Sequence, residues 1–184
     1  MQDSLNTIYE CKKPIIALID GICYGAGVDL ICCADMRLST KGAKFSVKEV
    51  DLGLAADLGT LQRLPKCVSS SGIALELCLT GRTWGASEAK AFGFIQGDLF
   101  DSYAQLKGSI SSALSVLEAG ENLAGILASK SQTAVENTKR SILDSYEHPS
   151  IKQGLQKIAL VNSSALQSEE LPRNVSNFLS KSKL

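Results

Sequence analysis

The sequence predicts an α/β protein, because strand and helix patterns alternate along its first half and helical patterns follow. A short apolar run at 15–19, bounded by Pro14 and Gly21, is typical of a strand buried on both faces. Closely spaced glycines come next. The apolar run 28–34 after them predicts a tight turn followed by a buried helix.

Shorter elements complete the expected order. Besides the strand and helix above, they are the end of a helix at 3–11, strands at 37–39 and 43–47, and helices at 58–64 (ended by Pro65), 70–79 and 86–91 (capped by Ser87 or Thr83). From about residue 104 the pattern is helical, with breaks expected near Gly120, at His148-Pro149 and near Pro172. We therefore predict a core over residues 1–103 and a helical region over residues 104–184.

The composition is that of a soluble globular chain and excludes several classes of function. Of the 184 residues, 45% are hydrophobic, and Lys+Arg and Asp+Glu both number 19, so no net charge attracts nucleic acid or an anionic membrane. No stretch is long and apolar enough to span a bilayer. The six cysteines show no metal-binding spacing, so we expect neither a metal site nor disulfides, and a reducing compartment.

A glycine turn and three acids could carry chemistry. In Gly25-Ala26-Gly27 the backbone can turn tightly, and the helix that follows leaves its first amide N–H groups unpaired, which suits the enolate oxygen of a thioester. Taken alone, such a turn more often reflects close packing. Asp29 sits in the first turn of that helix, with Glu49 twenty residues later and Asp57 eight after that.

The segment between Glu49 and Asp57 is mostly apolar. Carboxylates in such surroundings lose hydration and become better general bases. By itself Glu49 would be explained as a surface acid or as the ion-pair partner of Lys48. The combination with Asp57 and the glycine turn favours a catalytic site instead.

Several stretches resemble the enoyl-CoA hydratase/isomerase (crotonase) superfamily. They are Lys13-Pro14-Ile15-Ile16-Ala17-Leu18-Ile19-Asp20-Gly21, then Gly25-Ala26-Gly27-Val28-Asp29-Leu30 and Cys33-Ala34-Asp35. The run from Lys48 to Lys66 is closer still to the Δ3,5-Δ2,4-dienoyl-CoA isomerases of that superfamily. Weaker similarity continues through residues 81–93 and the C-terminal helices, so the resemblance spans nearly the whole chain. It implies a ββα spiral core of the crotonase type.

The resemblance also implies roles for individual residues. The backbone N–H of Ala26, where relatives commonly have Gly, would hold the thioester oxygen. Asp29, Glu49 and Asp57 occupy the isomerase's three acidic positions. Asp57 distinguishes the isomerases from the hydratases, which usually have a small residue there. Glu49 and Asp57 would serve the two ends of the substrate, C2 and C6, in an order that the sequence leaves open. A hydratase or a Δ3-Δ2-enoyl-CoA isomerase is the alternative.

The same resemblance suggests partners. The substrate would be an acyl-CoA, no cofactor or metal would be needed, and relatives form trimers or hexamers. The family's N-terminal segment, which supplies a second oxyanion donor and CoA contacts, has no counterpart in residues 1–12, so a truncated, non-catalytic subunit is a further alternative.

Ser182-Lys183-Leu184 at the end of the chain is a peroxisomal address read by an import receptor. This motif predicts that the protein acts in the peroxisome, in fatty-acid β-oxidation.

Overall fold

The computed structural model describes residues 1–104, 114–148, 150–168 and 170–181. The chain divides into two compact units, Met1–Ser129 and Lys130–Leu184, and each is described by itself. The sequence led us to expect the division at 103 and 104. The difference is helix α6 (Val116–Ala128), which packs against strands of the first unit and therefore belongs to it.

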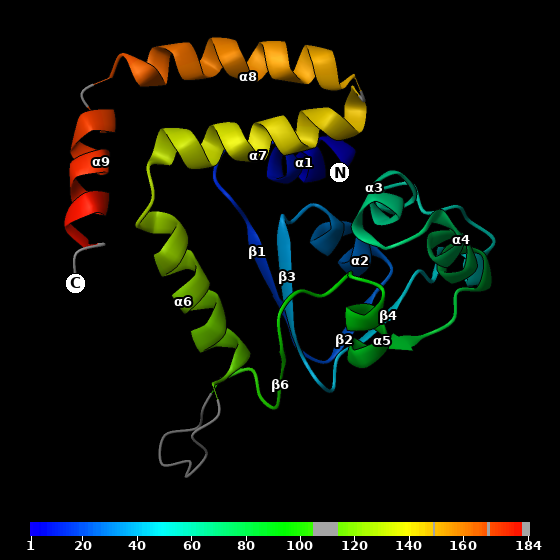
Figure 1. Cartoon of the computed structure of the whole chain (residues 1–184). Coiled ribbons are helices and arrows are strands. Elements are labelled where there is room, and N and C mark those ends of the chain that lie inside the picture. Colours follow the sequence, from blue (N-terminus) through cyan, green and yellow to red (C-terminus); the bar gives the residue numbers. More distant parts are fainter. Residues whose placement is uncertain (105–113, 149, 169, 182–184) are drawn as a thin grey trace. The chain divides into compact units, whose positions relative to one another are not determined.

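Two small sheets build the first unit (Figure 1). One is parallel in the order β1-β3-β6, formed by β1 (Ile16–Ile19), β3 (Met36–Thr40) and β6 (Leu99–Phe100). The other has the order β2-β4-β5, formed by β2 (Ile22–Tyr24), β4 (Lys44–Ser46) and β5 (Trp84–Gly85). In this second sheet β2 and β4 are parallel, with Tyr24 opposite Ser46, so the loops that follow the two strands leave the sheet side by side.

Helices complete the two units. The first unit holds α1 (Gln2–Tyr9), α2 (Ala26–Cys32), the 3-10 helix η1 (Glu49–Leu52), α3 (Thr60–Cys67), α4 (Ser71–Thr80), α5 (Ala86–Ala91) and α6. The second holds α7 (Gln132–Glu147), α8 (Ile151–Leu166) and α9 (Glu170–Lys181). Within the described ranges, none of these helices has the length and apolar character needed to cross a bilayer.

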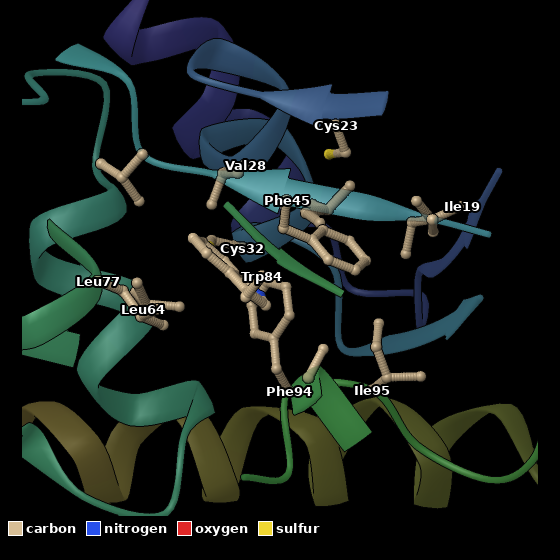
Figure 2. Close-up of a cluster of buried hydrophobic side chains, with 14 of the residues drawn as sticks. Ile19, Cys23, Val28, Cys32, Phe45, Leu64, Leu77, Trp84, Phe94 and Ile95 are labelled. Carbon is tan, nitrogen blue, oxygen red and sulfur yellow. The ribbon is translucent and has the colours of Figure 1, made fainter. Parts of the chain in front are cut away.

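The core of the first unit is built around an aromatic cluster. The rings of Phe45 and Trp84 stack with centroids 5.9 Å apart, and Phe94 meets Phe45 edge-on at 5.8 Å. Figure 2 shows these rings gathered with Val28 and Cys32 of α2. Such pairs add to the free energy gained from burial. The cluster holds β4 and α2 on one core, and these are the elements that lead into the acidic site.

Most of the expected elements are confirmed, within a residue or two at their ends. The strand at 15–19 is only partly buried, since Ile19 alone is fully shielded, because it lies next to just one other strand in a small sheet. The strand β2 was missed, because the glycines around it made the segment look like a single turn.

Three expected helix boundaries are wrong. Pro65 does not end α3, which runs on to Cys67, since a proline near the last turn removes only one backbone hydrogen bond while buried Leu64 holds the turn in place. The cap of α5 is Gly85, with no side-chain hydrogen bond, rather than Ser87 or Thr83. Gly120 lies inside α6 and does not break it.

Gly120 is instead a point of close approach. A Cβ at this position would lie 2.7 Å from Cδ2 of Leu18 in β1, so the helix can pack this closely only where the side chain is a hydrogen atom. Pro172 is also tolerated, because it lies in the first turn of α9, where the missing N–H has no helical partner.

We expect Gly120→Ala to lower the free energy of unfolding by about 1 kcal/mol. Overpacking against Leu18 costs roughly 1–3 kcal/mol, and the higher helix propensity of alanine offsets up to about 1 kcal/mol of it. Urea unfolding followed by circular dichroism measures the change. The matched control is Gly125→Ala in the same helix, where a Cβ meets nothing within 4 Å and which should stabilise the protein. Equal stabilisation by both substitutions would contradict the close contact.

Candidate active site

The glycine turn between β2 and α2 is held in a conformation that only glycine adopts readily. Gly25 has φ 52° and ψ −121°. Its N–H donates to the carbonyl of Ser46 at 2.9 Å, which ties the turn to the end of β4. Its carbonyl accepts from the N–H of Val28 at 2.7 Å, the first bond of the helix. The N–H groups of Ala26 and Gly27 therefore have no acceptor within α2 and lie at the positive end of its dipole.

The carboxylate of Glu49 lies against this turn. Glu49 begins η1, three residues after β4 ends, and its Oε1 is 3.0 Å from the position that a Cβ would take at Gly25. Its Oε2 is buried and has no hydrogen-bond partner among the described residues. A buried carboxylate oxygen without a donor is unfavourable and rare in proteins, and such groups are often functional. Glu49 is thus the acid placed beside the amide end of α2.

The neighbourhood of Glu49 removes the ion-pair explanation of this residue. The Nζ of Lys48 lies 2.8 Å from Oδ2 of Asp51 and donates to the carbonyl of Gly81, so its partners are elsewhere. The hydroxyl of Ser46 donates to the same carbonyl at 2.7 Å. Gly81 has φ 58°, and a Cβ there would lie 2.9 Å from Oδ1 of Asp51. These contacts fasten η1 to the end of α4 and orient Glu49.

Asp29 is fully buried and has its own partner. Its Oδ1 accepts from the N–H of Thr60 at 2.8 Å and from the Thr60 hydroxyl at 2.7 Å. Thr60 is the first residue of α3, so the carboxylate occupies the helix N-terminus, where the dipole and the free N–H groups stabilise a negative charge. Asp29 therefore joins α2 to α3.

The charges of Asp29 and Glu49 act on one neighbouring thiol. Burial raises the pKa of Cys78, on α4, and the charges of Glu49 and then Asp29 raise it further. The negative charges of the two carboxylates thus disfavour a thiolate at Cys78.

Asp57 lies in the loop between η1 and α3 and is exposed. Its backbone carbonyl accepts from Nε2 of Gln2 at 2.6 Å, and within the described part of the chain its carboxylate has no hydrogen bond or ion pair. The expected loss of hydration therefore holds for Oε2 of Glu49 but is wrong for Asp57. The apolar side chains before Asp57 point to solvent, with Leu52 75% and Leu54 61% exposed, so they do not shield it.

Thr60, Ser46 and Gly81 are parts of the site that we did not predict from the sequence. The expected helix began at residue 58, so neither the start of α3 at Thr60 nor the carboxylate that Thr60 binds was identified from the sequence. No cluster of three His, Cys, Asp or Glu side chains that could hold a metal ion occurs in the ranges that the structure covers. Ser182, Lys183 and Leu184, predicted as an address, lie outside the described residues.

We expect Thr60→Val to lower the free energy of unfolding by about 1–3 kcal/mol, because the buried Asp29 carboxylate loses the hydroxyl donor while the backbone donor stays. Chemical denaturation measures the loss. Thr60→Ser keeps the hydroxyl and is the matched control, so it should cost clearly less. If both variants unfold at the same denaturant concentration, the hydroxyl bond to Asp29 contributes nothing.

Comparison with known proteins places the chain in a family. Residues 1–183 match the family described as Enoyl-CoA hydratase/isomerase. The chain is 42% identical over 183 residues to the peroxisomal Delta(3,5)-Delta(2,4)-dienoyl-CoA isomerase of Arabidopsis thaliana, covering all of this chain and 61% of that protein. It is 39% identical over 174 residues to the mitochondrial Delta(3,5)-Delta(2,4)-dienoyl-CoA isomerase of Homo sapiens, covering 95% of this chain and 49% of that one.

A solved structure agrees with these matches. The crystal structure of enoyl-CoA hydratase/isomerase from Cupriavidus metallidurans CH34 superposes with a TM-score of 0.85 at 27% identity, covering 98% of this chain and 63% of that one. The chain thus spans about half to two thirds of the length of these relatives. The α/β fold with a helical C-terminal region, predicted as crotonase-like, is confirmed. The chain belongs to the enoyl-CoA hydratase/isomerase family.

Proposed function

We propose that this protein is a dienoyl-CoA isomerase, which converts a 3,5-dienoyl-CoA to a 2,4-dienoyl-CoA in fatty-acid β-oxidation. The observation that carries the proposal is the Glu49 carboxylate, held against Gly25 at the amide end of α2 with one oxygen buried and unpartnered. The names of the Arabidopsis and human relatives support the choice of reaction. So does the third acid, Asp57, eight residues after Glu49.

The chemistry begins at the thioester. Its oxygen accepts from the backbone N–H of Ala26, where the dipole of α2 favours the negative charge that develops when C2 loses a proton. Glu49 lies beside that amide, so we assign it the C2 proton. No metal or redox cofactor is required, because the thioester itself spreads the charge onto its oxygen.

The second half of the reaction uses Asp57. As the electron pair from C2 moves along the conjugated system, the double bonds shift from 3,5 to 2,4 and C6 takes up a proton. C2 and C6 lie too far apart for one fixed carboxylate, and Asp57 is the donor at the far end. Its exposure lets solvent restore the proton between turnovers. Exposed Leu52 and Leu54, between the two acids, offer apolar surface to the acyl chain.

The protein would act in the peroxisome and as a homo-oligomer. The tripeptide Ser182-Lys183-Leu184 and the peroxisomal relative from Arabidopsis support that compartment, whereas the human relative is mitochondrial. Oligomer formation is supported by α7 and α8, which have no buried residues and expose large apolar side chains such as Ile151 and Leu160. A trimer or hexamer would cover them.

The assay uses purified chain with 3,5-dienoyl-CoA, in parallel with 2-enoyl-CoA. We expect formation of the conjugated 2,4-diene, lowered by about a hundredfold or more in Glu49→Gln and in Asp57→Asn, since each loses a group that transfers a proton. Glu121→Gln and Asp98→Asn, at exposed positions away from the turn, are the matched controls and should retain full rates.

Other results would identify the alternatives. Hydration of 2-enoyl-CoA without diene isomerisation would assign the chain to the hydratases, and conversion of a 3-enoyl-CoA alone would assign it to the Δ3-Δ2-enoyl-CoA isomerases. If the chain neither turns over nor binds any acyl-CoA but purifies with a longer relative, it is a non-catalytic subunit. Each of these outcomes would contradict the proposal that the chain is a dienoyl-CoA isomerase.

A further inference from the structure

The loop that carries Asp57 is held by side chains to which the chemistry above assigns no role. The backbone carbonyl of Asp57 accepts from Nε2 of Gln2, in α1, at 2.6 Å. The next carbonyl, that of Leu58, accepts from Nη1 of Arg63, in α3, at 3.2 Å. Donors from two different helices therefore fix two consecutive peptide groups, directly after the Cα that bears the Asp57 carboxylate.

Arg63 connects this loop to α1. Its Nη2 donates to Oδ1 of Asn6, and its Cζ lies 4.9 Å from the centroid of the Tyr9 ring. The guanidinium is planar and presents its two terminal nitrogens to Leu58 and Asn6 at once, whereas a lysine has a single nitrogen and no fixed plane. The helix α1 is in turn attached to the first unit through Leu5, its buried residue.

The backbone at Gly59 is shaped to admit the guanidinium. Gly59 has φ 117°, which glycine adopts readily, and a Cβ there would overlap Nη1 of Arg63. Its carbonyl accepts from the N–H of Arg63 at 3.0 Å, so the loop passes directly into the first turn of α3. On the other side of Asp57, Ala56 is buried. The exposed Asp57 side chain therefore lies between two fixed points of the backbone.

We propose that Arg63 is a positioning residue that, together with Gln2, holds Asp57 where it can deliver a proton to the far end of a dienoyl substrate. The inference rests on the proposed function, which assigns the C6 proton to Asp57. Within the described residues no hydrogen bond or ion pair joins either side chain to the Asp57 carboxylate, so both act through the backbone. A displacement of about 1 Å at a reacting group can lower a rate on the order of a hundredfold.

The first measurement tests the anchoring of the loop without substrate. A protease that cleaves before aspartate is added to the folded protein, and cleavage before Asp57 is compared with cleavage before Asp98, an exposed reference position. We expect cleavage before Asp57 to be about threefold to tenfold faster in Arg63→Lys and in Gln2→Ala than in wild type, because each variant loses a hydrogen bond that holds the loop closed. Cleavage before Asp98 should stay at the wild-type rate.

The matched controls are Arg140→Lys, on α7, and Gln62→Ala, on α3, because both side chains are exposed. Both variants should be cleaved before Asp57 at the wild-type rate. The same rate before Asp57 in all variants would overturn the proposal. Equal acceleration before Asp57 and before Asp98 would overturn it too, because it would show a general loss of stability rather than release of this loop.

The second measurement separates the two proton transfers in Arg63→Lys. With 3,5-dienoyl-CoA in heavy water, absorbance follows formation of the 2,4-diene, and NMR follows exchange of the C2 hydrogens. We expect kcat for diene formation to fall about tenfold to a hundredfold at unchanged KM, while C2 exchange persists because Glu49 keeps its place. Equal loss of both signals would contradict a positioning role. If the wild type forms no diene, the proposed function fails, whereas the cleavage rates still decide whether Arg63 anchors the loop.

Discussion

The geometry of the site depends on glycine at position 25, where a side chain would collide with Glu49. The positive φ of Gly25 turns the chain into α2, and the absence of a Cβ leaves room for Oε1 of Glu49 at 3.0 Å. Parallel pairing of β2 with β4, with Tyr24 opposite Ser46, is what brings these two segments together, because each lies just beyond the end of its strand. The carboxylate and the free amides of α2 thus meet through backbone geometry, with the aromatic core holding the strands in place.

The two carboxylates nearest that turn differ in their hydrogen-bond partners. Asp29 accepts two hydrogen bonds from Thr60 at the start of α3, so its charge is stabilised inside the protein. Oε2 of Glu49 is buried without a donor in the described residues, which is unfavourable unless a ligand or a proton supplies the partner. Asp29, which has partners, joins the two helices, and Glu49, whose Oε2 has none among the described residues, is the acid to which we assign proton transfer. This division of roles follows from which acid has Thr60 within reach.

Much of this arrangement could be predicted from the sequence, for identifiable reasons. The apolar run 15–19 and the glycines before 28–34 carry local signals, so the strand, turn and helix followed from periodicity. The three acids were singled out from their positions after the glycine turn and their apolar neighbours, and the resemblance supplied their separate roles. The partner of Asp29 could not be predicted, because the contact with Thr60 joins residues 31 positions apart and depends on the packing of α2 against α3. The exposure of Asp57 could not be predicted either, since residues that are apolar neighbours in the sequence need not pack against it in the fold.

In the proposed mechanism, Glu49 removes a proton from C2 because Gly25 lets its carboxylate approach the amide end of α2. The most direct measurement is exchange of the C2 hydrogens of 3,5-dienoyl-CoA with solvent deuterium, followed by NMR, in wild type, Gly25→Ala and Gly85→Ala. At Gly85 a Cβ meets nothing within 4 Å and φ is −95°, so it serves as the control. Exchange in wild type and Gly85→Ala, with loss in a folded Gly25→Ala, is the predicted result. Undiminished exchange in Gly25→Ala, or none in wild type, would contradict it.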